Sequence, residues 1–292
     1  MIQRVGIVAK TSLTQAAGHL TEIGEWLRAR GIEPIFEQET ASLASARAGL
    51  RTADREQLPR EVDLMVVLGG DGTLLGTAGR IARSGADIPI LGVNFGGLGF
   101  LTEITLPELY PSLEAALAGA ARIDDRLMLR SVTTRAGRVL ADRIVLNDVV
   151  ITKGALARII DLSVWVDDQF LSRFRSDGLI IASPTGSTAY NLAAAGPIIH
   201  PQVNAVVLTP IAPHTLTNRP IVIPASAEVR VQPLAEGTNE EIYLTLDGQF
   251  SLPLHPEDVV SVRRAEQRLR LVRASTRSYF EVLREKLKWG ER

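Results

Sequence analysis

The sequence contains no cysteine among its 292 residues. This excludes disulfides and thiol chemistry, and it leaves oxygen and imidazole groups as the possible metal ligands. The four histidines show no metal-ligand spacing, and no serine, histidine and acid can be grouped into a catalytic triad. Lysine is also scarce, so arginine carries almost all the positive charge. The lysines are Lys10, Lys153, Lys286 and Lys288.

Long hydrophobic runs and a strong net charge are absent as well. No apolar run approaches membrane-spanning length, and the first run, between Arg4 and Lys10, is too short for a signal peptide. The formal net charge is −1, so neither nucleic acid nor an anionic membrane is the expected partner. The length and the ordinary apolar content favour two globular domains. We expect a cytoplasmic protein.

The stretch Leu64–Leu75 is the centre of the pattern. Its unbroken apolar run Leu64–Leu68 predicts a strand buried on both faces, as in a parallel sheet. Gly69–Thr73 follows with three glycines and one acid, and Leu74–Ala82 predicts a helix. In open α/β sheets, ligands bind where strands end at the carboxyl edge.

Asp71 is unusual in such a turn. Glycines let a phosphate approach backbone N–H groups, and a helix N-terminus favours anions, but a carboxylate repels them. Asp71 therefore indicates a second task, such as accepting a proton, positioning a hydroxyl or helping to hold a metal. The alternative is a tight turn in which Asp71 caps the helix. No lysine follows at the P-loop spacing, so backbone groups, Mg²⁺ or distant arginines would hold a phosphate.

The first part of the chain alternates strands and helices, which predicts a doubly wound parallel sheet. A second glycine-rich turn, residues 94–101, follows a predicted strand at Pro89–Val93, and we expect it at the same sheet edge as the first. Phe100 in this turn suits either base stacking or the core. The other expected elements are strands at Val5–Ala9 and Ile32–Phe36 and helices at Leu13–Arg30 and Pro107–Ala118.

The pattern changes after Gly119. Short β-rich runs separated by turn signals extend from Ile123 to about Val272 and predict an antiparallel β domain. Tyr279–Trp289 predicts an amphipathic helix that packs back on the first domain. We expect an α/β domain over residues 1–121, completed by residues 275–292, and a β-rich domain over residues 122–274.

Two stretches of the β domain place polar side chains beside apolar strands. Asn147 and Asp148 interrupt a strand, which is costly unless both are satisfied. They suit ribose hydroxyls and a base edge, or else a β-turn. Later, four hydroxyls crowd a predicted helix N-terminus; capping explains one or two of them, so the turn is predicted to serve a phosphorylated ligand. These hydroxyls belong to Ser183, Thr185, Ser187 and Thr188.

Together these stretches resemble the NAD kinase family, in its Gram-negative bacterial branch, over nearly the whole chain. The Gly-Gly-Asp-Gly turn alone also resembles diacylglycerol, sphingosine and phosphofructokinase-type kinases, whereas the Thr-Gly-Ser-Thr-Ala-Tyr run is far more specific. The matching motifs are Gly69–Thr73, Gly96-x-Leu98-Gly99-Phe100, Asn147-Asp148, Asp177-Gly178, Ser183–Tyr190, and Pro213-His214-x-Leu216 before Arg219-Pro220.

The resemblance implies ATP-dependent phosphorylation of the adenosine ribose 2′-hydroxyl of NAD to give NADP, with Mg²⁺ or another divalent cation. It implies that Asp71 is the general base and that Asn147 and Asp148 hold ribose hydroxyls. It also implies a homodimer or homotetramer, and it names no protein residue as a metal ligand. The ATP phosphates would meet Gly69, Gly70, Gly72 and Thr73. The other implied contacts to the nucleotides are Phe100, Arg158, Arg175, Asp177, Thr188, Ala189, Tyr190, Asn191, Leu192, Ala193 and Gln249.

The sequence departs from the family at one position, because Asp148 stands where the family usually has glutamate. Two rival functions remain open. A lipid kinase shares the glycine turn, although no basic amphipathic helix is visible in the sequence. A sensor could bind NAD(H) without turnover, although simple phosphate binding gains nothing from the charge of Asp71.

Overall fold

The protein is described from a computed structural model that covers residues 2–13, 16–44, 50–154, 159–215, 217–234, 241–273 and 277–290. The chain forms two compact units. Unit 1 comprises Met1–Asp125 and Leu269–Arg292, and unit 2 comprises Arg126–Arg268. The chain passes from one unit to the other inside two strands, β7 (Arg122–Arg135) and β18 (Asp258–Arg273). The composition of these strands is not that of a flexible linker. The bounds predicted from the sequence lie at residues 121–122 and 274–275, near the ends of the same strands.

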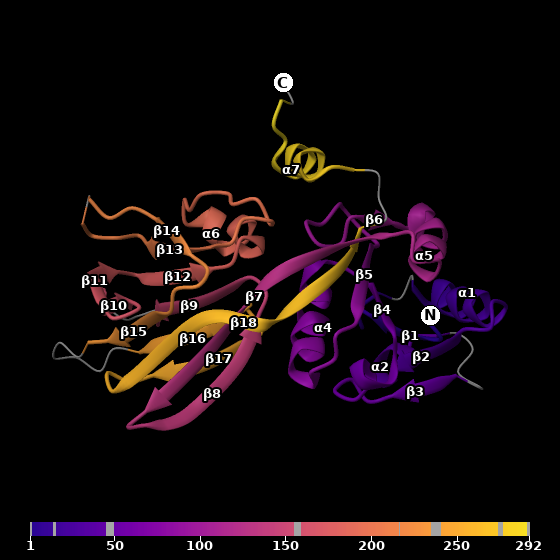
Figure 1. The fold of residues 1–292 in the computed structure, drawn as a ribbon, viewed down its shortest axis with the longest axis horizontal. Helices are drawn as coiled ribbons and strands as arrows, with labels where there is room; N and C mark the ends of the chain where they lie inside the picture. Colours follow the sequence, from indigo (N-terminus) through magenta and orange to yellow (C-terminus); the bar gives the residue numbers. More distant parts are fainter. Residues whose placement is uncertain are drawn as a thin grey trace. The chain divides into compact units, whose positions relative to one another are not determined.

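Unit 1 contains a parallel sheet in the order β3-β2-β1-β4-β5 (Figure 1). The last residues of β18 pair with β5, also in parallel. The predicted α/β class is confirmed. The elements are β1 Arg4–Ala9, α1 Ala16–Arg28, β2 Glu33–Glu37, α2 Gln38–Ala41, β3 Arg51–Ala53, α3 Leu58–Glu61, β4 Leu64–Leu68, α4 Asp71–Ser84, β5 Pro89–Asn94, β6 Ile104–Thr105, the 3₁₀ helix η1 Leu106–Glu108, and α5 Leu109–Leu117.

The strand order reverses between β1 and β4. From β1 the chain runs outward through β2 to β3, whereas β4 and β5 lie on the other side of β1. All five residues of β4 are buried, as expected for a strand covered on both faces. In doubly wound sheets, the carboxyl edge at such a reversal is the usual place for a ligand.

The C-terminal helix α7 (Tyr279–Leu287) belongs to unit 1. It begins with a capping box, in which Ser278 and Glu281 each accept a hydrogen bond from the other's backbone N–H. Just before it, Arg277 Nη1 lies 3.2 Å from the Glu103 carbonyl oxygen and 3.3 Å from Glu108 Oε2. The predicted return of the final helix to the first domain therefore rests on polar contacts just before the helix and on its buried side chains Val282 and Leu283.

Unit 2 is antiparallel, as predicted. One sheet has the order β14-β13-β12-β9-β16-β17; β11, β10, β15 and β18 form a second series, and β7 pairs with β8. One cluster of buried apolar side chains contains residues from both sets of strands. The elements are β8 Arg138–Val145, β9 Asp148–Lys153, β10 Ile160–Val166, β11 Gln169–Ser176, β12 Gly178–Ala182, the 3₁₀ helix η2 Thr185–Thr188, α6 Tyr190–Ala193, β13 Ala205–Ile211, β14 Ile221–Pro224, β15 Val229–Pro233, β16 Ile242–Leu246, and β17 Phe250–Leu254.

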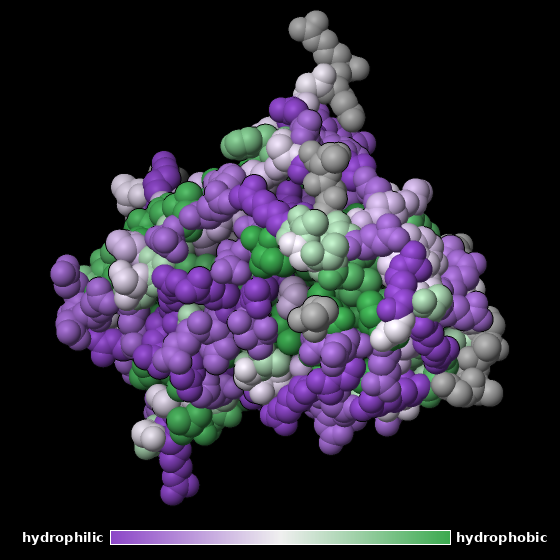
Figure 2. Space-filling model, turned by 45° about the vertical axis from the view of Figure 1, so that its right-hand side comes forward, coloured by the Kyte–Doolittle hydropathy of each residue, from purple (hydrophilic) through white to green (hydrophobic). Residues whose placement is uncertain are grey.

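Hydrophilic residues predominate on the face drawn in Figure 2, with apolar residues in patches among them. The exposed large apolar side chains include Val139, Phe170 and Trp289. Scattered apolar exposure of this kind is normal for a globular surface. None of the described helices is both long and apolar enough to span a bilayer.

Candidate active site

Asp71 lies between the two glycine turns of unit 1. It is the first residue of α4, directly after the turn that ends β4. Its Oδ2 accepts a hydrogen bond from Phe100 N at 2.9 Å. Its Oδ1 accepts three, from Leu101 N at 3.1 Å, Thr102 N at 3.0 Å and Thr102 Oγ1 at 2.9 Å. The second turn therefore fixes the orientation of the carboxylate, and the predicted meeting of the two turns at one edge is confirmed.

The capping alternative for Asp71 is wrong. Gly70 is the N-cap of α4, and no side chain makes a capping hydrogen bond there. The Asp71 carboxylate points away from its own helix and bonds residues 29 to 31 positions later. A capping residue serves its own first turn, so Asp71 has a different role.

The glycines of the two turns serve two purposes. A methyl group on Gly99 would lie 2.3 Å from Asp71 Oδ1 and 2.3 Å from Thr102 Oγ1, so Gly99 makes room for the carboxylate. A methyl group on Gly70 or Gly72 would meet no protein atom within 4 Å. The space beside Gly70 and Gly72 is therefore open, as a close approach by phosphate requires, whereas a methyl group on Gly69 would lie 2.8 Å from Thr73 Oγ1.

Phe100 is neither fully buried nor free. Its side chain is partly exposed, and Lys286 Nζ of α7 lies 5.8 Å from its ring centroid, within cation–π range. The sequence left base stacking and the core as alternatives. The partly exposed ring is neither fully in the core nor fully open to solvent.

The predicted Asn147–Asp148 pair is held by the carboxylate of Asp247, which lies in the turn between β16 and β17. Asp247 Oδ2 accepts from Leu146 N at 2.8 Å, and its Oδ1 accepts from Asn147 N at 2.8 Å and Asp148 N at 3.0 Å. Asp247 has a φ of 50°, and Gly248 follows with a φ of 65°. Aspartate tolerates this left-handed backbone. The Asp-Gly pair was the available signal, but its distant partners were not visible in the sequence.

Asp148 is buried, with 5% of its surface exposed. Burial and, second, the negative charge of Asp247 raise the pKa of Asp148 to about 7. Burial also raises the pKa of Asp247, although its three backbone hydrogen bonds lower it. Asp148 is therefore ready either to donate or to accept a hydrogen bond near neutral pH, which suits a hydroxyl ligand.

This raised pKa predicts a pH-dependent stability. Between its ordinary value of 3.8 and about 7, the folded chain binds more protons than the unfolded chain, so the free energy of unfolding falls as the pH rises through this window. Above pH 7 the loss is complete, on the order of 4 kcal/mol. Asp148→Asn should be more stable than the wild type, by a margin that grows from pH 5 to pH 8. Urea unfolding at several pH values measures this.

The exposed Asp168, whose side chain pairs with Arg230 on the surface, offers a matched control. Asp168→Asn should differ from the wild type by a margin that does not change over this pH range. A constant margin for Asp148→Asn as well would contradict the raised pKa.

The two serine hydroxyls of the hydroxyl-rich turn make hydrogen bonds to the backbone. Ser183 and Ser187 are fully buried. Ser183 Oγ donates to Leu146 O at 2.5 Å and accepts from Gly186 N at 3.1 Å. Ser187 Oγ donates to Pro184 O at 2.6 Å and accepts from Ile199 N at 2.9 Å. These two serines bond backbone groups of the turn and of the neighbouring residues Leu146 and Ile199.

The turn also packs tightly on the Asn147 segment. Ser183 N donates to Asn147 O at 2.9 Å, and a methyl group on Gly186 would lie 2.1 Å from the same oxygen. Thr185 is buried as well, and its Oγ1 accepts a hydrogen bond from Arg126 Nη1 at 3.5 Å. Thr188 is partly exposed, and its Oγ1 donates to Thr185 O at 3.3 Å. Two motifs that are far apart in the sequence are thereby brought together.

Asn191 was predicted to contact the dinucleotide, and the structure gives its side chain another task. It is fully buried. Its Nδ2 donates to Ser187 O at 3.0 Å and to Pro197 O at 3.1 Å, and its Oδ1 accepts from Thr209 Oγ1 at 2.6 Å. The amide therefore holds α6 against β13, and the contact of Asn191 with the dinucleotide stays a prediction.

The remaining predicted contacts of unit 2 differ in exposure. Asp177 pairs with Lys153, with 3.1 Å between Oδ1 and Nζ. Arg175 and Gln249 are exposed, as are Tyr190 and Ala193, while Ala189 and Leu192 are partly exposed. Arg158 lies outside the described residues. All of these side chains stay predictions as ligand contacts.

Few side chains in the described part of the chain are placed to bind a divalent cation. No group of three or more histidine, aspartate and glutamate side chains able to hold a metal occurs in the described parts of the chain. Asp71 Oδ1 already accepts three hydrogen bonds. This fits Mg²⁺, which is usually held by one or two carboxylates together with substrate phosphates and water.

An open glycine turn beside an oriented carboxylate, at the strand reversal of a parallel sheet, defines a protein of the nucleotide-dependent phosphoryl-transfer class. Residues 5–121 match the family model for the ATP-NAD kinase N-terminal domain, and residues 146–274 match that for the ATP-NAD kinase C-terminal domain. The chain belongs to the ATP-NAD kinase family.

Relatives and solved structures agree with this assignment. The chain is 50% identical over 291 residues to an NAD kinase of Geotalea daltonii and 47% identical over 292 residues to one of Solibacter usitatus; in both cases all of this chain and at least 99% of the relative are covered. It resembles yeast NADH kinase complexed with NADH at a TM-score of 0.88 and 25% identity, covering all of this chain and 89% of that one. An Archaeoglobus fulgidus NAD kinase in complex with ATP shares the fold at a TM-score of 0.75 and 24% identity, covering 97% and 99% of the two chains.

Proposed function

We propose that this chain transfers the γ-phosphoryl group of ATP to the 2′-hydroxyl of the adenosine ribose of NAD and so makes NADP. The observation that carries the proposal is the Asp71 carboxylate, fixed by the second glycine turn beside the open backbone of the first, in a member of the ATP-NAD kinase family. The ligands of the two similar structures, NADH and ATP, support the same pair of substrates.

The hydrogen bonds of Asp71 indicate which oxygen is the base. Oδ1 accepts three hydrogen bonds, whereas Oδ2 accepts one, from Phe100 N. Oδ2 therefore retains a lone pair for the ribose hydroxyl. In the transfer, the 2′-oxygen forms a bond to the γ-phosphorus, its proton passes to Asp71 Oδ2, and the bond to the β-phosphate oxygen breaks to release ADP.

The NAD side of the reaction is proposed for unit 2. Asn147 and Asp148 would hold ribose hydroxyls. The Asp247 carboxylate, which accepts hydrogen bonds from the N–H groups of both residues, would keep them in position. Good positioning accounts for much of the acceleration in phosphoryl transfer, because the enzyme makes no covalent intermediate of its own. The further contacts proposed from the family are Phe100, Arg158, Arg175, Asp177, Thr188, Ala189, Tyr190, Leu192, Ala193 and Gln249.

Mg²⁺ is proposed to arrive with ATP and to neutralise charge on its β- and γ-phosphates. Such a complex would lie closest to Gly69–Thr73, where the space beside Gly70 and Gly72 is open. The family resemblance also supports a homodimer or homotetramer that works in the cytoplasm.

One assay tests the proposal. Purified protein is incubated with Mg-ATP and NAD, and NADP is measured with an NADP-specific dehydrogenase. We expect NADP and ADP in equal amounts. Binding of NAD without any NADP formation would favour a sensor, and ADP formation that requires a lipid acceptor would favour a lipid kinase.

A further inference from the structure

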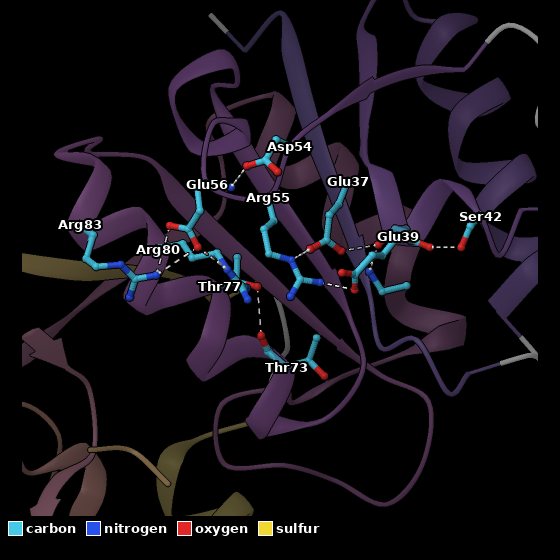
Figure 3. Close-up of polar contacts among 12 residues, drawn as sticks. Glu37, Glu39, Ser42, Asp54, Arg55, Glu56, Thr73, Thr77, Arg80 and Arg83 are labelled. Carbon is cyan, nitrogen blue, oxygen red and sulfur yellow. Dashed lines mark hydrogen bonds and ion pairs between the residues drawn. The ribbon is translucent and has the colours of Figure 1, made fainter. Parts of the chain in front are cut away.

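The first glycine turn carries no cation of its own, although it is proposed to receive a highly charged triphosphate. The residues Gly69–Thr73 contain one acid and no base. The arginines that follow β3 and lie along α4 are already paired with acids (Figure 3). Arg55 Nε lies 3.0 Å from Glu37 Oε1, and Arg55 also pairs with Glu39; Arg80 and Arg83 both pair with Glu56 at 3.3 Å.

Lys10 is different. It is exposed and follows directly after β1. Within the part of the chain that the structure describes, its ammonium group makes no hydrogen bond or ion pair. A charged group without a protein partner at the carboxyl edge of the sheet remains available for an anionic ligand.

The backbone places Lys10 beside the first glycine turn. Lys10 N donates to Leu68 O at 3.0 Å, and Leu68 is the residue before Gly69. A methyl group on Gly69 would lie 3.3 Å from Lys10 Cβ. β1 and β4 are also the two strands between which the sheet order reverses, so Lys10 and the turn lie on either side of the point where doubly wound sheets bind ligands.

We propose that Lys10 binds the β- and γ-phosphates of ATP over the Gly69–Thr73 turn. Its ammonium would supply the point charge that a P-loop lysine supplies from within its own loop, but from a neighbouring strand. The long flexible side chain allows the charge to follow the phosphates, whereas the backbone N–H groups of the turn are fixed. This inference rests on the proposed function, because it assigns a residue to the donor nucleotide.

Kinetics of Lys10→Gln, with saturating NAD and varied ATP, test the inference. We expect the KM for ATP to rise by about tenfold to a hundredfold, the range for losing one charge-assisted hydrogen bond. The KM for NAD should stay within about twofold. Lys10→Arg should restore most of the ATP affinity, since it keeps the charge.

Arg4→Gln provides the matched control, because Arg4 begins the same strand β1 at its opposite end and pairs with Asp63. This variant loses the same charge and should keep the wild-type KM for ATP. An unchanged KM for ATP in Lys10→Gln, or an equal rise in the KM for NAD, overturns the inference. An equal rise in the KM for ATP in Arg4→Gln does so too, since it would reflect overall charge.

Calorimetry with a non-hydrolysable ATP analogue separates this inference from the proposed function. If the wild type binds the analogue but forms no NADP, the kinase proposal fails, and the ratio of dissociation constants for Lys10→Gln and wild type still decides the role of Lys10. If the wild type forms NADP and both proteins bind the analogue equally, only the Lys10 inference fails. A wild type that does not bind the analogue contradicts both.

Discussion

Asp71→Asn is expected to lower kcat for NADP formation by about 10²-fold or more, the usual magnitude of general-base catalysis. The amide oxygen can still accept the hydrogen bonds of Leu101 and Thr102, so the second glycine turn keeps most of its anchor. The amide nitrogen that replaces Oδ2 cannot accept a proton. Steady-state rates at saturating ATP and NAD measure the effect, and thermal unfolding confirms that the variant is folded.

Asp63→Asn is the matched control for this variant. Asp63 also accepts hydrogen bonds from backbone N–H groups, those of Gln3 and Arg4 at 2.9 and 2.8 Å, but at the opposite end of β1. The same chemical change there should leave kcat within about twofold of the wild type. Near-normal turnover in Asp71→Asn would remove Asp71 from the catalytic role.

Gly99→Ala is expected to lower kcat by about 10²-fold although Asp71 is retained. The added methyl group would lie 2.3 Å from Asp71 Oδ1, so either the carboxylate or the loop must move. A displacement of about 1 Å in a catalytic group can cost 10²-fold in rate. The KM for NAD should change less than kcat, since most of the proposed NAD contacts lie in unit 2.

Gly97→Ala makes the same change two residues earlier in the loop, where the methyl group would meet nothing within 4 Å. It should keep nearly the wild-type rate. The double variant Asp71→Asn/Gly99→Ala should be little worse than Asp71→Asn alone, because both changes act on one carboxylate. Equal losses in Gly97→Ala and Gly99→Ala, or full additivity in the double variant, would contradict this explanation.

The sequence predicted the elements of the site better than their connections. The buried run Leu64–Leu68 and the glycines around Asp71 defined the strand, the turn and the sheet edge, because each signal is local. The partners of Asp71 are mainly backbone N–H groups of residues 100–102. Every residue except proline carries such a donor, so no residue type marked them.

The same reason explains what the sequence did not show in unit 2. Ser183, Ser187 and Asn191 looked available because their types are common in ligand sites, but they bond the backbone of nearby turns. Asp247 looked like an ordinary turn residue, yet it holds three N–H groups about 100 positions away. Residue type predicts hydrogen-bonding capacity, and only the fold determines which partner uses it.

The hairpin between β16 and β17 bears a constraint that is rare for surface turns. Insertions are usually tolerated at such tips, because a longer loop costs little entropy. The β7–β8 turn, with Ala136 and Gly137 at its tip, has no side-chain acceptor to displace. One extra residue beside Asp247 would shift its carboxylate off the Leu146–Asp148 backbone. The length of this hairpin is therefore tied to the hydrogen bonds that hold Asn147 and Asp148, and engineered insertions or tags belong at the other tip.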